Sequence, residues 1–124
     1  MKSAIIILSD PKSASDEATT RMLNGLAMAD DCKRAGDEVE IVFAGTGTRW
    51  PAELSKLSHP AHALYDALRD HVKGASRACA VRNEATEGLA AAGVPLIGDN
   101  AVAGTPGVLS IRRFHAEGWN VATF

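Results

Sequence analysis

Cysteine is the residue type in this sequence best suited to covalent chemistry, and Cys79 has the more favourable of two settings. The sequence predicts a strand over 75–80 and a helix from about Arg82 to Ala92, which puts Cys79 where the strand runs into the helix. Backbone N–H groups at a helix N-terminus carry partial positive charge and stabilise the nucleophilic thiolate form of cysteine. Arg82 adds positive charge beside it. The alternative is a buried thiol that serves only as a small apolar core residue.

The second cysteine, Cys32, is predicted to lie near the C-terminal end of the first helix, where the helix dipole disfavours a thiolate. Packing is therefore the better interpretation of Cys32. The two cysteines lack the Cys-x-x-Cys spacing of dithiol redox sites and zinc ribbons, so free thiols are expected. The histidines show no recognised metal-ligand spacing, and neither a metal nor a cofactor is predicted. They are His59, His62, His71 and His115.

Glycine and threonine alternate in the segment Gly45-Thr46-Gly47-Thr48, which is predicted to follow the second strand. The segment resembles a phosphate-binding loop only loosely, because it lacks the Gly-x-Gly-x-x-Gly pattern and the lysine of a Walker motif. An ordinary connection between a strand and a helix is the favoured interpretation. The loop still offers backbone N–H donors to an anionic ligand.

Strands and helices alternate along the chain. A continuous apolar run predicts a buried strand over 4–8. Further strands are predicted over 39–44, 75–80 and 119–124, and a short strand or extended segment over 93–98. Helices are predicted over about 16–34, 51–72 with a break near Pro60, 82–92 and 107–117, with loops over 45–48 and 99–106. The first helix has its entry at Ser13-Ala14-Ser15-Asp16-Glu17, where a capping Ser or Asp precedes an acidic first turn, and Gly36 ends it.

This alternation predicts the α/β class, with right-handed crossovers and a mainly parallel sheet of about five strands between helical layers. In open α/β sheets, ligands bind outside the carboxyl ends of the strands. The segments expected at those ends supply the candidate site. Its catalytic candidate is Cys79, and its ligand-binding candidates are Ser9, Asp10, Gly45, Thr46, Gly47, Arg82 and Thr105.

Length and charge narrow the possible functions. The 124 residues fit a single domain over 1–124, and 46% apolar residues supply one core. A net charge of -2 gives no electrostatic footprint for nucleic acid or for an anionic membrane. No apolar run is long enough to span a bilayer. The opening apolar run ends at Asp10 and Pro11 without a cleavage-like segment, so it is interpreted as a buried strand of a cytoplasmic protein.

From Gly74 to Phe124 the sequence resembles the DsrE/DsrF-like family of small sulfur-relay proteins. The likeness rests on Ala78-Cys79-Ala80, on a small-residue helix ending at Ala92-Gly93-Val94, and on the segment Thr105-Pro106-Gly107-Val108-Leu109. The closing segment Glu117-Gly118-Trp119-Asn120-Val121 is similar as well, with a glycine and an aromatic residue entering a last strand.

The resemblance implies a three-layer α/β/α sandwich that assembles as a homo-trimer or homo-hexamer. It also implies that Cys79 accepts persulfide sulfur from a donor protein or a small persulfide and passes it to an acceptor protein. The alternative hypothesis is a non-catalytic oligomeric module that binds a small anionic ligand or a protein partner. The polar residues Ser76 and Arg77 indicate that the third strand begins later than residue 75 or lies near a sheet edge.

Overall fold

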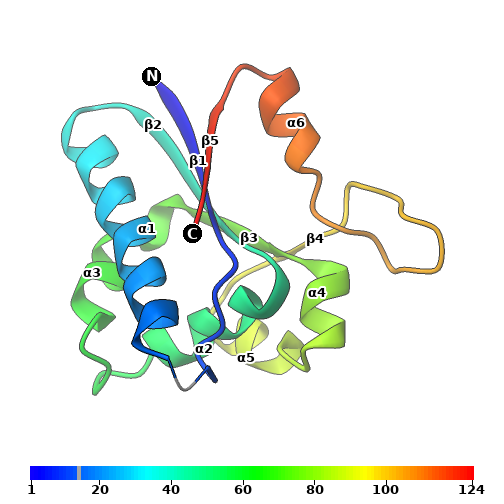
Figure 1. Cartoon of the computed structure of the whole chain (residues 1–124), viewed down its shortest axis with the longest axis horizontal. Helices are drawn as coiled ribbons and strands as arrows, with labels where there is room; N and C mark the ends of the chain where they lie inside the picture. Colours follow the sequence, from blue (N-terminus) through cyan, green and yellow to red (C-terminus); the bar gives the residue numbers. More distant parts are fainter. Residues whose placement is uncertain (14) are drawn as a thin grey trace.

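One five-stranded parallel sheet forms the centre of the protein, in a computed structural model that describes residues 1–13 and 15–124. Its strands are β1 (Lys2–Ile7), β2 (Glu38–Phe43), β3 (Val72–Ser76), β4 (Leu96–Ile97) and β5 (Asn120–Thr123). Every pairing is parallel, and the order is β4-β3-β2-β1-β5, as Figure 1 shows. The predicted α/β class and parallel sheet are therefore confirmed.

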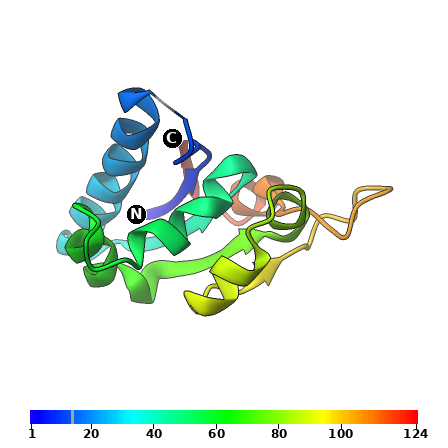
Figure 2. The ribbon, with the colours of Figure 1, turned by 90° about the horizontal axis from the view of Figure 1, so that it is seen from below.

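The direction of the chain through the sheet decides where the helices lie. The chain steps from β1 to β4 in one direction, and right-handed crossovers then place the connecting helices on one face. These are α1 (Asp16–Arg34), α2 (Trp50–Leu54), α3 (His62–Ala67), α4 (Arg77–Arg82) and α5 (Thr86–Ala91). The return from β4 to β5 carries α6 (Ile111–Ala116) over the other face, so that α1 and α6 lie on opposite sides of the sheet (Figure 2). This is the predicted three-layer sandwich, with one thin layer.

The two faces of the sheet bury cores of different size, because alternate residues of a strand point to opposite sides. The larger core lies on the α1 side and includes Ile5, Ile7, Met22, Leu26, Phe43, Trp50 and Tyr65. The smaller core lies on the α6 side and consists of Ala4, Ile6, Val42, Ala44, Leu109 and Phe114.

The prediction for α1 is confirmed in its extent. Ser15 caps the helix, since its Oγ accepts the backbone N–H of Glu17 at 3.0 Å. Met22 and Leu26 are buried at helical spacing, and the chain reverses after Arg34 through Gly36 at φ +80°. Ala14, which belongs to the predicted helix entry, lies outside the described residues.

The predicted boundary between the third strand and the following helix is wrong. β3 covers Val72–Ser76 rather than 75–80, and α4 begins at Arg77. The chain leaves the sheet at Ser76, whose buried Oγ accepts the backbone N–H of Leu109 at 3.1 Å. Cys79 therefore lies in the first turn of α4. The later strand start suggested by the polar residues is also wrong, although β3 does lie next to the edge strand β4.

Three other predicted segments differ in detail from the structure. The loop predicted over 45–48 is a 3-10 helix, η1 (Gly45–Arg49). The helical region over 51–72 is broken around Pro60 as predicted, but it consists of α2, α3 and a 3-10 turn, η2 (Arg69–His71). The helix predicted over 107–117 begins only at Ile111, because Val108 forms an antiparallel bridge with Asn100.

The helix predicted over 82–92 is divided by a left-handed residue, Glu84, at φ 54°. Glu84 follows the end of α4 in a Schellman motif, with the N–H of Ala85 donating to the carbonyl of Ala80 at 2.8 Å and the N–H of Glu84 donating to Val81 at 3.3 Å. Glycine usually occupies this position, because a Cβ clashes in the left-handed region. The turn thus carries backbone strain.

Replacing this glutamate tests the strain. Glu84→Gly should raise the free energy of unfolding by about 1 kcal/mol, because glycine accepts a positive φ without the Cβ clash. Glu84→Ala is the matched control, since it removes the same charge but keeps the Cβ. Urea denaturation of both variants measures the effect, and equal stability of the two would contradict the assignment of strain.

Candidate functional site

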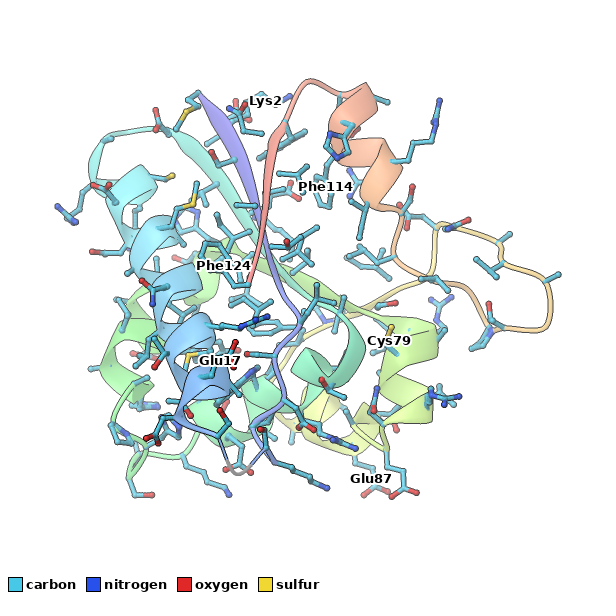
Figure 3. All side chains as sticks on the ribbon, viewed as in Figure 1. Lys2, Glu17, Cys79, Glu87, Phe114 and Phe124 are labelled. Carbon is cyan, nitrogen blue, oxygen red and sulfur yellow. The ribbon has the colours of Figure 1, made fainter. Side chains whose placement is uncertain are left out.

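Cys79 lies in a groove beside α4. The groove has a volume of about 430 Å³, and Cys79 is partly exposed there. Figure 3 labels Cys79 on the first turn of α4, close to the end of the helix that meets β3. The lining combines α4 with the end of the loop before α6, and consists of Ala78, Cys79, Val81, Arg82, Gly104, Thr105 and Pro106.

Two tertiary hydrogen bonds fix the position of this turn. Ser76, immediately before α4, uses its hydroxyl to accept the N–H of Leu109 and therefore does not cap the helix. The backbone N–H of Ala78 donates to the carbonyl of Gly107 at 2.9 Å. One of the N–H groups expected to face the thiol is thus already paired. α4 itself is short, with six residues.

Arg82 gives the groove its charge. Among the described residues that line it, Arg82 is the charged one, and no carboxylate faces the thiol. Arg82 is exposed and forms no ion pair within residues 1–13 and 15–124. Thr105 lies in the same groove, where its Oγ1 donates to the carbonyl of Val102 at 2.7 Å. The structure therefore brings together three predicted site residues: the thiol, a cation and a threonine.

The other predicted ligand-binding residues lie away from this groove. Ser9 and Asp10 line a separate cavity of about 240 Å³ beside the start of α1. Their polar groups already have partners in the protein. The Oγ of Ser9 donates to the carbonyl of Ala18 at 2.8 Å, and Asp10 forms an ion pair with Arg49 at 3.1 Å. The expected convergence of all strand ends on one site does not occur.

The Gly45 loop packs against β1. Thr46 donates its hydroxyl to the carbonyl of Leu8 at 2.9 Å. A Cβ on Gly47 would overlap the carbonyl oxygen of Ile7, so only glycine permits this close approach of the two backbones. Gly45 contributes its carbonyl oxygen, which accepts hydrogen bonds from other residues. These contacts support the interpretation as an ordinary connection.

Arg49 and Asn83 connect the two regions, and neither was among the predicted site residues. The Nδ2 of Asn83 donates to the carbonyl of Cys79 at 2.8 Å and to that of Gly45 at 3.1 Å. Arg49 donates to the carbonyl of Asn83 at 3.3 Å and binds both carboxylate oxygens of Asp10. Arg49 is the last residue of η1 and Asn83 follows the last residue of α4, so a helix separates each of them from the preceding strand. The strand-end rule that selected Asp10 therefore did not reach them.

Cys32 has the packing role expected of it. It lies on α1, is 5% exposed and belongs to the larger core. Both cysteines are free thiols, and Cys79 is the more accessible. In the part of the chain that the structure describes, no group of three His, Cys, Asp or Glu side chains is placed to hold a metal ion. No helix there is long and apolar enough to cross a membrane.

Fold and groove together define a class: an α/β protein with a parallel sheet and an accessible cysteine just beyond the carboxyl end of one strand. Comparison with known proteins adds no family. No family model matches the chain, and no match is found among the curated proteins or the solved structures. Membership of the DsrE/DsrF-like family stays a prediction from the residues that resemble it.

Asp10 makes the fold sensitive to acid. Burial alone would raise the pKa of its carboxyl, but hydrogen bonds from the Lys12 N–H and from Arg49 outweigh burial and lower the pKa below its ordinary value of 3.8. A carboxyl with a lowered pKa stabilises the fold above the pKa of the unfolded chain. That contribution is lost as the pH falls through the pKa of the folded protein.

Replacing Asp10 tests this pH dependence. Asp10→Asn should lower the free energy of unfolding at pH 7 by about 1 kcal/mol or less, because a partly exposed ion pair is lost. The difference from the wild type should shrink as the pH falls below about 4. Urea denaturation at pH 7, 5 and 3 measures it. Asp70→Asn is the control, and a difference between wild type and Asp10→Asn that is the same at every pH would refute the linkage.

Proposed function

We propose that this protein handles sulfane sulfur, carrying it as a persulfide on Cys79. The observation that carries the proposal is the groove itself, which is lined by a partly exposed free thiol and by Arg82, whose guanidinium forms no ion pair among the described residues. The positive charge of Arg82 attracts an anionic persulfide to the groove. The resemblance of the segment around Cys79 to DsrE/DsrF-like proteins supports the same chemistry.

The proposed reaction is a transfer of one sulfur atom without net oxidation. The Cys79 thiolate attacks the outer sulfur of a donor persulfide. A new S–S bond forms at Cys79, and the S–S bond of the donor breaks, so that the donor leaves as a thiolate. An acceptor thiolate then attacks the outer sulfur on Cys79 and releases the Cys79 thiolate. The step needs no metal or organic cofactor.

Access to the groove sets which molecules take part. Apart from Arg82 and Thr105, the residues that line the groove are mostly apolar. Because Cys79 is partly exposed in the groove, a donor or an acceptor reaches its sulfur from solvent. We propose the cytosol as the compartment, because both cysteines are free thiols and a reducing environment preserves them.

Mass spectrometry tests the loading of sulfur directly. After incubation with a small persulfide donor, the wild type should gain about 32 Da, one sulfur atom, on a peptide that contains Cys79. Cys32→Ser should load equally well, because Cys32 is buried in the core. Cys79→Ser should not load.

A missing adduct on folded wild-type protein, with a reactive control thiol fully loaded, would sink the proposal. If the donor is then found bound without a covalent adduct, the chain is the non-catalytic module that binds a small anionic ligand. Native mass spectrometry distinguishes a bound donor from a covalent persulfide, because denaturation releases only the bound donor.

The charge on Arg82 should set the rate of loading. Arg82→Glu should slow loading by an anionic persulfide by about threefold to tenfold, since it replaces the one groove cation by an anion. Lys56→Glu changes the net charge equally on the exposed connection between α2 and α3 and should leave the rate unchanged. Equal slowing of both variants would mean that net charge, and not the groove, controls the reaction.

A further inference from the structure

A histidine ring accepts a hydrogen bond from the backbone in the connection between α2 and α3. The backbone N–H of Ala61 donates to the Nδ1 of His59 at 3.0 Å, with Pro60 between the two residues. Asn and Asp side chains commonly accept the N–H of the residue two positions later in turns of this kind. Here an imidazole ring takes that place directly before α3, which begins at His62.

This contact fixes where the ring carries its proton. A backbone N–H only donates, so the Nδ1 of His59 must offer a lone pair, and the proton of the neutral ring lies on Nε2. Two other histidines face the opposite kind of group. The Nδ1 of His62 lies 2.8 Å from the carbonyl of Leu54, and that of His71 lies 3.3 Å from the carbonyl of Val39. A carbonyl only accepts, so these two rings donate from Nδ1 and keep that bond when charged. Of the three, His59 is the ring whose contact requires the neutral form.

A positive charge on His59 removes its hydrogen bond. The imidazolium carries a proton on both nitrogens, so no rotation of the ring offers a lone pair to the N–H of Ala61. Ala61 is 4% exposed, and leaving a buried donor without a partner costs free energy. The segment therefore has to open until water replaces the ring as the acceptor.

The same ring belongs to the packing of this segment. It lies edge-on to the indole of Trp50, the buried first residue of α2, with 6.3 Å between the ring centroids. The backbone of His59 donates to the carbonyl of Lys56 at 3.0 Å and accepts the N–H of His62 at 3.0 Å. Movement of the ring thus disturbs the start of α2 and the start of α3 together.

The charged groups on the surrounding elements already have partners. On α2, on α3 and on the connection between them, the other charged or titratable side chains are Glu53, Lys56, His62, Tyr65 and Asp66. Glu53 pairs with Lys56 at 3.0 Å, and Asp66 pairs with Arg69 at 3.5 Å. Tyr65 is buried, which raises the pKa of its hydroxyl. From α1, Lys33 reaches the far end of α3 and donates to the carbonyl of Ala67 at 2.6 Å. Both carboxylates on these segments are thus engaged elsewhere.

We propose that His59 is a pH-sensitive contact that keeps the connection between α2 and α3 closed while its ring is neutral. Histidine is the side-chain type that ordinarily changes charge between pH 5 and 8. The hydrogen bond is therefore present at pH 8 and is lost as the ring takes up a proton toward pH 5. Asp10 responds only in more acidic solution. The inference does not rest on the proposed sulfur chemistry, so either can fail while the other stands.

Nitrogen NMR on the full chain tests the ring directly. Long-range proton–nitrogen spectra at pH 8 should show the Nδ1 of His59 without a proton and its Nε2 with one. His62 is the internal reference and should show a proton on Nδ1, since it faces a carbonyl. A proton on the Nδ1 of His59 at pH 8 would refute the contact from which the inference starts.

Hydrogen exchange measures the opening of the segment. In the wild type, the protection of the Ala61 amide should fall about fivefold to tenfold from pH 8 to pH 5, after correction for intrinsic exchange. This factor corresponds to the net contribution of one hydrogen bond. Protection that stays constant in the wild type would overturn the proposal.

Two asparagine variants assign the effect to one ring. His59→Asn keeps an oxygen that accepts the same N–H and does not titrate, so it should protect Ala61 to within about twofold at both pH values. His62→Asn is the matched control, because it removes the neighbouring titrating ring and should retain the loss seen in the wild type. Circular dichroism at both pH values confirms that each variant is folded.

The remaining outcomes contradict the assignment. An equal loss of protection in His59→Asn, or no loss in His62→Asn, would show that another group controls the segment. If either variant does not fold, the wild type still decides, because the protonation of the His59 ring and the protection of Ala61 are both measured on the unmodified chain.

Discussion

The guanidinium of Arg49 holds together the carboxyl edge of the sheet. It binds both carboxylate oxygens of Asp10 after β1, and it donates to the carbonyl of Asn83 at the end of α4. Asn83 extends this network, because its side-chain amide donates hydrogen bonds to the carbonyl groups of Gly45 and Cys79. The turn that carries the thiol is therefore fixed to the first two strands by side-chain hydrogen bonds, and the position of Cys79 depends on this chain of polar contacts.

The fold could be predicted where one physical signal dominates. The apolar runs of β1 and β2 and the helical spacing of Met22 and Leu26 in α1 gave these elements nearly their observed bounds. The region around Cys79 offered no such signal, because small residues pack equally well in a strand and a helix. β3 ends at Ser76 because the hydroxyl of Ser76 accepts a hydrogen bond from the backbone N–H of Leu109, which lies far along the chain. No local sequence pattern indicates such a tertiary contact. Three candidate site residues share a groove. Gly45, Thr46 and Gly47 belong to the η1 segment that packs against β1, whereas Ser9 and Asp10 line a separate cavity beside α1.

The topology explains both the thin layer and the exposed loop over residues 99–106. Since β4 and β5 lie at opposite edges of the sheet, their connection must cross the whole α6 face. Within this connection, one short helix, α6, covers the smaller core. In that core the ring of Phe114 packs edge-on against the ring of Trp119, with 5.9 Å between the ring centroids. The rest of the connection includes the loop over residues 99–106, which extends away from the sheet (Figure 1). The exposed loop thus arises from the strand order.

The position of β5 beside β1 also governs how the chain folds during its synthesis. β1 is made first, yet one of its edges stays unpaired until residues 120–123 leave the ribosome. Until then the buried strand residues Ala4 to Ile7 lie next to an open row of backbone N–H and C=O groups, which is a template for pairing with other chains. The pairing of β1 with β5 is slow, because two segments far apart in the sequence must lose the entropy of loop closure before their contacts form.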